Sequence, residues 1–381
     1  MPGGRATIKY RVSPNVVCHW RQGRLYAVNF ATRYQVSVNR LVMAVLTDLG
    51  DWRTVAEVGH SLGTAPTREL HQLLARLLEA TILQSSRSAL VPRDRAMERW
   101  EAWNPSVGLF HGMSSGVSFL ENDPPRKGRA RVRPIEGRLV HKSGHTIRLA
   151  RPEITSDFDR TVLERRTWRR FSDEDLPRTA VEHLLWLTAG VQGWLKAPRG
   201  EMLPLTTSPS GGSRHPIEVY AFVKHVRGLS AGLYRYDGVA HTLRTIGPPP
   251  ARTRDYLPRQ YWFENAPLII FLCAQFGRTM ERYPFPRAYR AVLLEAGHVC
   301  QTFCLAATAL GLAPFCTMAL DDHRIEADLG LDGVEMAVLY AAGVGVRSRR
   351  GTPAAPLGER DIAITPASIK EHHGRRRSPR R

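Results

Sequence analysis

The sequence predicts an α+β or α/β sandwich, preceded by a small winged-helix-like domain. Residues 267–276 (PLIIFLCAQF) are apolar at nearly every position, which is typical of a strand buried on both faces. Residues 290–310 are apolar almost all round a helix, which indicates a buried helix. Residues 8–34 alternate between apolar and polar and precede three amphipathic helical patterns. Strands that are apolar on both faces and alternate with helices predict the sandwich. The short strands followed by three amphipathic helices predict the smaller domain.

Local signals place the individual elements. Two or three short strands are expected in residues 8–34, with a hairpin turn at 21–24 (RQGR). Helices are expected at 36–49, 54–63 and 68–83 in the smaller domain. In the sandwich, Pro177 in a first turn and Gly190 near an end mark a helix over 176–191. Further strands are expected at 217–226 and 334–346.

Composition divides the chain into four segments. The predicted segments are the winged-helix-like domain at 1–91, a linker at 92–150, the sandwich at 151–350 and a tail at 351–381. The linker is rich in Arg, Pro and Gly, and we expect one helix at 93–103 with Trp100 and Trp103 as aromatic anchors. The tail ends in GRRRSPRR, a basic run that is typical of disorder.

Composition and charge exclude several classes of protein. A hydrophobic content of 43% indicates a folded globular chain. No apolar run approaches the roughly 18 residues of a membrane helix, and no signal peptide is recognisable, so we expect a cytoplasmic protein. The net charge of +19 suits an anionic cofactor or an acidic peptide. No zinc finger, helix-turn-helix or aromatic-interleaved basic patch supports a specific nucleic-acid reader.

An arginine-rich heptapeptide is the first candidate binding motif. Residues 165–171 (RRTWRRF) contain Arg165, Arg166, Thr167 and Arg169. Guanidinium groups match the geometry of a phosphate dianion, and each charge-assisted hydrogen bond is worth roughly 1.5–3 kcal/mol. The motif therefore predicts a phosphate site, and a solvated basic surface is the alternative.

A loop of small residues is the second candidate. It directly precedes the predicted strand at 217–226 and includes Ser208, Pro209, Ser210, Gly211 and Gly212. Such residues let backbone amides approach a flat or anionic ligand closely. The loop matches neither a dinucleotide fingerprint nor a Walker loop, and an ordinary flexible loop is the alternative.

A cation beside a tyrosine is the third candidate. Arg282 and Tyr283 form a pair that can serve acid–base chemistry, although a packing tyrosine is the alternative. His298 is expected to be a satisfied helix histidine. Cys300 and Cys304 lie one helical turn apart, but no CxxC or HxxxH partner accompanies them. We therefore interpret them as buried small hydrophobes and predict no metal site.

Taken in order, these motifs resemble the nitroreductase superfamily, and within it the SagB-type peptide dehydrogenases that oxidise azolines to azoles. The resemblance covers about residues 160–346 and rests on RRTWRRF, SPSGGSRHPIEVY, GLYRYD, RAYRAVLLEAGHVCQ and the LDD…LGLDGVE pattern. It implies an α+β, nitroreductase-like sandwich with a central mixed sheet flanked by helices. It also implies FMN bound at a homodimer interface. The first 90 residues resemble, more weakly, a peptide-recognition module that binds leader peptides.

The resemblance further implies roles for single residues. Arg165, Thr167 and Arg169 match the residues that hold the FMN phosphate and ribityl chain, and Arg347 is a further phosphate ligand. Ser208, Pro209, Ser210 and Gly212 match a loop that covers the flavin and often comes from the other subunit. Thr317, Met318 and Ala319 match the stretch whose backbone N–H can hydrogen-bond the flavin N5, with Pro314 to Cys316 as rivals in register.

The chain departs from the family at one catalytic position. Azoline oxidases of this type carry a Lys-Tyr pair, and the matching pair here is Arg282-Tyr283. Arginine stays protonated, so it can stabilise negative charge but cannot act as a base. The expected function is FMN-dependent azoline dehydrogenation of a leader-bearing peptide, beside a cyclodehydratase partner. An NAD(P)H-dependent nitro- or quinone reductase and a non-catalytic leader-binding scaffold are the alternatives.

Overall fold

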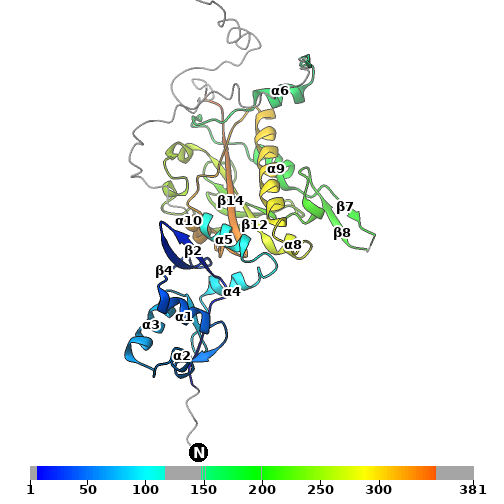
Figure 1. Cartoon of the computed structure of the whole chain (residues 1–381). Coiled ribbons are helices and arrows are strands. Elements are labelled where there is room, and N and C mark those ends of the chain that lie inside the picture. The colour runs from blue at the N-terminus through cyan, green and yellow to red at the C-terminus, as the bar shows by residue number, and fades with distance from the viewer. Residues whose placement is uncertain (1–6, 116–146, 148, 151, 199, 349–381) are drawn as a thin grey trace, which may run out of the picture.

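The computed structural model describes residues 7–115, 147, 149–150, 152–198 and 200–348 (Figure 1). The N-terminal region, drawn in blue, projects from one end of the larger C-terminal domain. The predicted basic tail at 351–381 lies outside the described residues, as does most of the second half of the predicted linker at 92–150.

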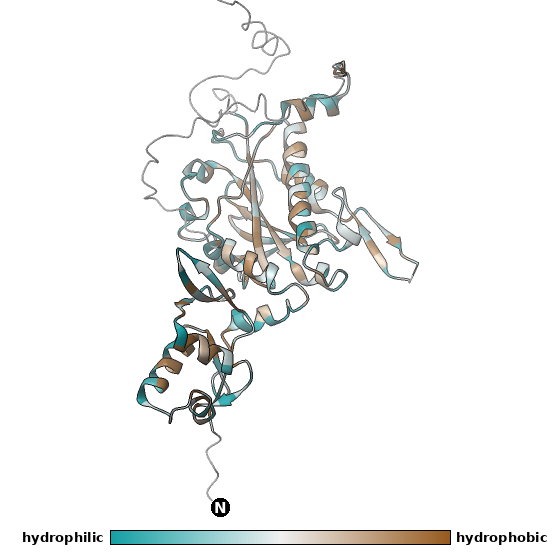
Figure 2. Ribbon diagram, viewed as in Figure 1, coloured by the Kyte–Doolittle hydropathy of each residue, from teal (hydrophilic) through white to brown (hydrophobic). Residues whose placement is uncertain are grey.

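A six-stranded sheet forms the centre of the C-terminal domain, in the order β11-β10-β9-β12-β14-β13. Its strands are β9 (Ile217–Val223), β10 (Gly232–Asp237), β11 (Thr242–Gly247), β12 (Leu268–Gln275), β13 (Ala313–Thr317) and β14 (Met336–Gly345). β12 is buried along nearly its whole length, as expected for a strand covered on both faces. The central strands are accordingly coloured as hydrophobic in Figure 2. The predicted α+β sandwich is confirmed.

Every strand pairing within this sheet is antiparallel, whereas a mixed sheet was expected. β9, β10 and β11 follow one another through short connections, which only antiparallel neighbours can use. The long connections, which contain helices, lead to β12, β13 and β14. The relative direction of those strands was not readable from the local sequence.

The long helix α9 (Ala288–Ala309) is the core helix of the domain. It packs against α7 (Arg178–Ala189) and against the sheet beside β13 and β14. Its length and hydropathy alone would allow it to cross a membrane, but 56% of that apolar stretch is buried inside the domain. Burial on several sides explains why its sequence is apolar almost all round.

Smaller elements surround this core. They are the helices α6 (Asp157–Glu164), α8 (Phe276–Met280) and α10 (Asp322–Leu329), and the hairpin of β7 (Gly193–Lys196) and β8 (Met202–Leu205). Three short 3-10 helices are η1 (Gly211–Ser213), η2 (Arg254–Tyr256) and η3 (Tyr261–Asn265). The β7–β8 hairpin projects away from the body of the domain (Figure 1).

The N-terminal region combines two small sheets with three helices. One sheet joins β1 (Lys9–Val12) to β5 (Arg53–Thr54) and β6 (Leu83–Ser85), and the other joins β2 (Val16–Arg21), β3 (Arg24–Asn29) and β4 (Gln35–Ser37). The helices are α1 (Arg40–Asp48), α2 (Val55–Ser61) and α3 (Arg68–Glu79). Its assignment as a winged-helix-like domain stays a prediction.

Local chemistry accounts for the details of this region. The predicted hairpin turn is confirmed, since Gln22 and Gly23 both have positive φ (50° and 74°), as a tight two-residue turn requires. The helix predicted from residue 36 begins at Arg40 instead. The reason is the cap, because the Asn39 side chain accepts a hydrogen bond of 2.9 Å from the Val42 amide.

The described part of the predicted linker, residues 92–115, is packed against the rest of the protein. It contains α4 (Pro92–Glu98) and α5 (Ser106–Ser114), so the helix predicted to reach residue 103 ends earlier and a second helix follows. Pro105 disfavours helix in the residue before it and has no N–H to donate. Trp100 and Trp103 are fully buried against Phe276 and Tyr289 of the C-terminal domain, as expected of aromatic anchors.

A buried carboxylate ties this segment to the N-terminal region. Asp94 on α4 accepts hydrogen bonds from Ser13, Asn15, Asn29 and Gln84, at 2.8–3.2 Å. A buried charge needs such compensation, because its removal from water is costly. The N-terminal region is therefore fixed through α4 to the segment that packs on the C-terminal domain.

Candidate functional site

The arginine-rich heptapeptide lies beside the edge of the central sheet. The Trp168 amide donates to the Pro314 carbonyl of β13 at 2.9 Å, and Phe171 forms a bridge with Arg347 just beyond β14. These contacts bring together Arg165, Thr167, Arg169, Thr317 and Arg347, which we call the basic cradle. The structure thus places the stretches that carry the predicted phosphate-binding residues next to the strand that ends at Thr317, where the flavin ring was predicted to lie.

The charges of the basic cradle suit an anion. In the described part of the chain, neither Arg165 nor Arg347 forms an ion pair with a carboxylate. The Arg347 guanidinium donates to the Leu312 carbonyl at 3.0 Å and lies over the Trp168 ring at 5.5 Å, so its position is fixed. Arg166 instead donates to the backbone carbonyl of Arg165 at 2.7 Å. A guanidinium group that has no carboxylate partner keeps its positive charge available to a phosphate.

The predicted flavin-approaching stretch continues from β13. The Thr317 hydroxyl accepts hydrogen bonds from the Ala319 amide at 3.1 Å and from Gln260 at 3.0 Å, and Gln260 also donates to the Ala319 carbonyl. Met318 between them is 74% exposed. Gln260 orients this stretch, and no motif in the sequence singled it out.

The predicted small-residue loop, residues 208–215 (the glycine loop), is shaped by unusual backbone conformations. Gly212, Ser213 and His215 all have positive φ, at 63°, 54° and 44°. A hydrogen bond of 2.9 Å from the His215 amide to the Ser210 hydroxyl closes the loop. Positive φ in residues other than glycine costs energy and persists where the surrounding structure enforces it. The loop is a built element and not an ordinary flexible connection.

Tyr283 lies directly against the glycine loop. A Cβ added to Gly212 would lie 2.5 Å from the Tyr283 hydroxyl, so only glycine fits there. The Tyr283 carbonyl accepts a hydrogen bond of 3.1 Å from the Trp103 indole, and the Arg282 guanidinium lies 5.7 Å from the tyrosine ring. The structure therefore brings the predicted catalytic pair to the predicted loop, and it adds Trp103 as a support that the motifs did not reveal.

A buried glutamate on α9 faces the same loop. Glu295 is 4% exposed and accepts hydrogen bonds from the Ser210 hydroxyl and the Gly211 amide. Burial nevertheless raises the pKa of Glu295 to about 7. The group was missed, although a carboxylate within an otherwise apolar helix is itself a signal. A neighbouring cavity of about 380 Å³ is lined by Trp194, His215, Glu218, Arg278 and Glu295, among others.

The glycine loop and the basic cradle lie on opposite sides of α9. On one side, Glu295 contacts Gly211, and Thr302 bonds to the Ser208 hydroxyl at 2.8 Å. Cys304, which faces β13, follows Glu295 by nine residues, or about 180° of helical rotation. Within one chain the predicted cofactor-binding residues therefore form two separate groups.

Comparison with known proteins assigns the fold of the C-terminal domain. Residues 162–346 match the model of the nitroreductase family. A Methanocaldococcus jannaschii protein named for the nitroreductases is 29% identical over 185 residues, which are 48% of this chain and 89% of that protein. The domain has the nitroreductase-like fold that the resemblance implied.

A second relative is named for the processing of trifolitoxin. The trifolitoxin-processing protein TfxB of Rhizobium leguminosarum is 35% identical over 131 residues, which are 32% of this chain and 35% of TfxB. The chain thus spans only about a third of that relative.

Two solved structures are also similar. A nitroreductase-type protein of Ralstonia eutropha matches with 25% identity and a TM-score of 0.42, over 52% of this chain and 88% of that chain. The E. coli microcin synthetase complex McbBCD with truncated pro-MccB17 bound matches with 20% identity and a TM-score of 0.40, over 55% of this chain and 79% of that chain.

Proposed function

We propose that this protein is an FMN-dependent dehydrogenase that oxidises azoline rings to azoles in a ribosomally made peptide. The observation that carries the proposal is the position of Tyr283. Its hydroxyl lies at the glycine loop, and its backbone is held by Trp103 of the segment that follows the N-terminal region. Kinship with a trifolitoxin-processing protein supports a peptide as the substrate.

The basic cradle fits FMN by the chemistry of its donors. Arg165 and Arg347 carry positive charge and form no ion pair with a carboxylate among the described residues, which suits the phosphate dianion of FMN. Thr317 and Ala319 follow on β13 and the turn after it, held in place by their mutual hydrogen bond and by Gln260. FMN, when bound, supplies the acceptor for the hydride that leaves the ring.

A homodimer would complete the site. The cradle and the glycine loop are separated by α9 in one chain, so a second copy is the natural source of the missing half. Exposed apolar side chains near the glycine loop support such an interface, namely Leu293 and Leu294 on α9 and Trp194, Leu195, Met202 and Leu205 on the β7–β8 hairpin. Leu294→Asp should yield monomers by light scattering and lose FMN, and a variant that stays dimeric would place the interface elsewhere.

Tyr283 is the proposed proton acceptor. Loss of two hydrogens from an azoline requires removal of an acidic proton from carbon as well as a hydride. The Tyr283 hydroxyl is the group of the Arg282-Tyr283 pair that can exchange a proton, since arginine stays protonated. The Arg282 guanidinium lies 5.7 Å from the centre of the tyrosine ring and keeps a positive charge beside the proposed proton acceptor.

The N-terminal region is proposed to hold the leader of the peptide. Binding at a distance from the reacting ring raises the effective concentration of that ring at the site. The net charge of +19 favours an acidic leader. A cyclodehydratase, which forms azolines from Cys, Ser or Thr residues, is the expected partner.

The test begins with the visible spectrum of the purified protein and continues with the mass of an azoline-bearing peptide. A yellow protein and a loss of two hydrogens per ring are expected. A flavin that is bleached by NADPH, with an unchanged peptide, would favour a nitro- or quinone reductase. A colourless protein that binds the peptide would favour a scaffold.

A further inference from the structure

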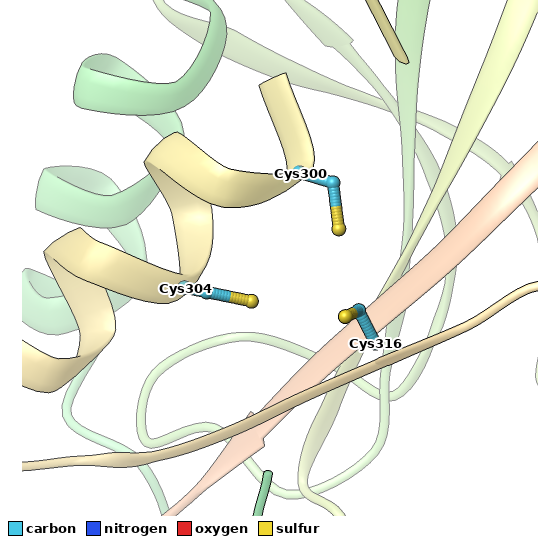
Figure 3. Close-up of side chains that lie close together, drawn as sticks. All are labelled: Cys300, Cys304 and Cys316. Atoms are coloured by element: carbon cyan, nitrogen blue, oxygen red, sulfur yellow. The ribbon is translucent and has the colours of Figure 1, made fainter. Parts of the chain in front are cut away.

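We propose that Cys300, Cys304 and Cys316 bind one soft, thiophilic metal ion, best matched by Cu(I), through three thiolates. The three sulfur atoms lie within 4.8 Å of one another. Figure 3 shows the side chains converging on a common point. The inference is independent of the proposed function, because it needs neither flavin nor peptide.

The third sulfur comes from a different element. Cys300 and Cys304 lie one turn apart on α9, and Cys316 projects toward them from β13. In the sequence, Cys300 and Cys304 supply only two ligands, and they were therefore interpreted as buried packing residues. The fold adds the third ligand, because α9 and β13 pack side by side.

The sulfur spacing is close to that of a trigonal site. Three sulfurs in a plane, each about 2.3 Å from a metal, lie about 4 Å apart. Since no pair exceeds 4.8 Å, side-chain rotations that contract the triangle by less than about 1 Å would suffice. The Tyr340 hydroxyl donates to the Cys316 sulfur at 3.4 Å, which orients that ligand from outside the triangle.

The donor set selects the ion. Among the described residues, no His, Asp or Glu joins the three cysteines in this group. A set of three sulfur ligands favours a soft ion that accepts three ligands. Zn²⁺ prefers four. Metal binding releases the thiol protons and leaves negative charge on the sulfurs.

Burial protects the site. Cys300 and Cys304 are each 2% exposed, and Cys316 is partly buried. An ion held by the three sulfurs would therefore be largely shielded from water. Bound there, it would tie α9 to the strand from which the Thr317–Ala319 stretch of the candidate site extends.

The experiment is a Cu(I) titration of the full-length, reduced, flavin-free protein under anaerobic conditions, in competition with bicinchoninate. One Cu(I) per chain should be retained, and X-ray absorption should show three sulfurs at about 2.3 Å. Loss of a group outside the ligand sphere typically costs about 10–100-fold in affinity, so Cys316→Ser, which removes a ligand, should cost at least about 100-fold. Tyr340→Phe should cost about 10-fold.

Cys18→Ser is the matched control, because Cys18 is an exposed cysteine on β2, outside the cluster. It should leave copper binding unchanged. Near-UV circular dichroism checks that each variant is folded, and the absorption measurement on the unsubstituted protein requires no variant. Failure to compete with bicinchoninate, fewer than three sulfur ligands, or copper lost through Cys18→Ser would overturn the proposal. A disulfide within the cluster in place of bound metal would also overturn it. None of these outcomes bears on flavin binding, which the visible spectrum tests separately.

Discussion

The basic cradle and the glycine loop place candidate ligand-binding groups by different means. The cradle is built on the sheet: its backbone is fixed by hydrogen bonds to β13 and by the bridge between Phe171 and Arg347, and its selectivity comes from charge. The loop rests on α9, takes up strained conformations, and fits Tyr283 only because Gly212 has no side chain. From this difference we expect ligand binding at the cradle to be sensitive to the loss of a charge. We expect the loop to be sensitive to the addition of a side chain.

Removing the Tyr283 hydroxyl tests the loop half with the largest expected effect. Tyr283→Phe should lower turnover of an azoline peptide by about 100-fold or more, the usual contribution of a general acid or base, while FMN stays bound. Peptide mass spectrometry and the flavin absorbance measure the two quantities. Arg160→Ala, at the exposed ion pair with Asp157 on α6, should change neither. Unaltered turnover in Tyr283→Phe would show that Tyr283 is not the catalytic base.

Removing a charge tests the cradle half. Arg165→Ala should weaken FMN binding by roughly 10–100-fold, since a hydrogen bond to a charged group contributes about 1.5–3 kcal/mol. Fluorescence titration with FMN measures the change. Arg160→Ala is the control, because Arg160 on α6 pairs with Asp157 and lies outside the cradle. Full FMN affinity in Arg165→Ala would move the phosphate site elsewhere.

Adding one methyl group tests whether shape governs the loop. Gly212→Ala should destabilise the fold by about 1–3 kcal/mol, because alanine is strained at a φ of 63° and its Cβ would collide with the Tyr283 hydroxyl. Gly211→Ala is the neighbouring control, since its Cβ would meet only the Ala291 methyl at 3.6 Å, an ordinary contact. Denaturant unfolding compares the two, and equal losses would contradict the distinction.

The smallest expected effect concerns Glu295, the buried carboxyl group beside the glycine loop, and is seen in the pH dependence of stability. Because burial raises the pKa of Glu295 from 4.5 to about 7, the folded protein holds more protons than the unfolded chain between these values. This group therefore makes the protein less stable as pH rises from about 4.5 to 7, by on the order of 1–3 kcal/mol. Glu295→Gln should remove that loss, measured as unfolding free energy at pH 5 and pH 8.

A second buried group acts in the opposite direction. Burial lowers the pKa of His111 from 6.5 to about 4, so its contribution is lost as pH falls through that range. The free energy of unfolding of Glu295→Gln should therefore be compared with that of the unsubstituted protein at each pH, so that the effect of His111 cancels. If that difference is the same at pH 5 and pH 8, Glu295 does not titrate as described.

Interactions between distant residues limited what could be predicted. The motif at 165–171 was recognisable because its charge is local, and the loop at 208–215 because its small residues are consecutive. Gln260 and the support of Tyr283 by Trp103 carry no local pattern, since each depends on a partner far along the chain. Glu295 interrupts an apolar stretch of helix, but its contacts with the loop at Ser210 and Gly211 could not be read from that stretch. Cys316 was likewise invisible as a partner of Cys300 and Cys304.

The sequence by itself determined the elements of the core and the chemistry of the motifs. Apolar periodicity is a local property, and it was enough to place β12, β14, α7 and α9 to within a few residues. Only the tertiary structure decided that every strand pairing in the central sheet is antiparallel, that Tyr283 meets Gly212, and that the two halves of the candidate site lie on opposite sides of α9. These are contacts between residues distant along the chain, and the packing of the whole core selects them.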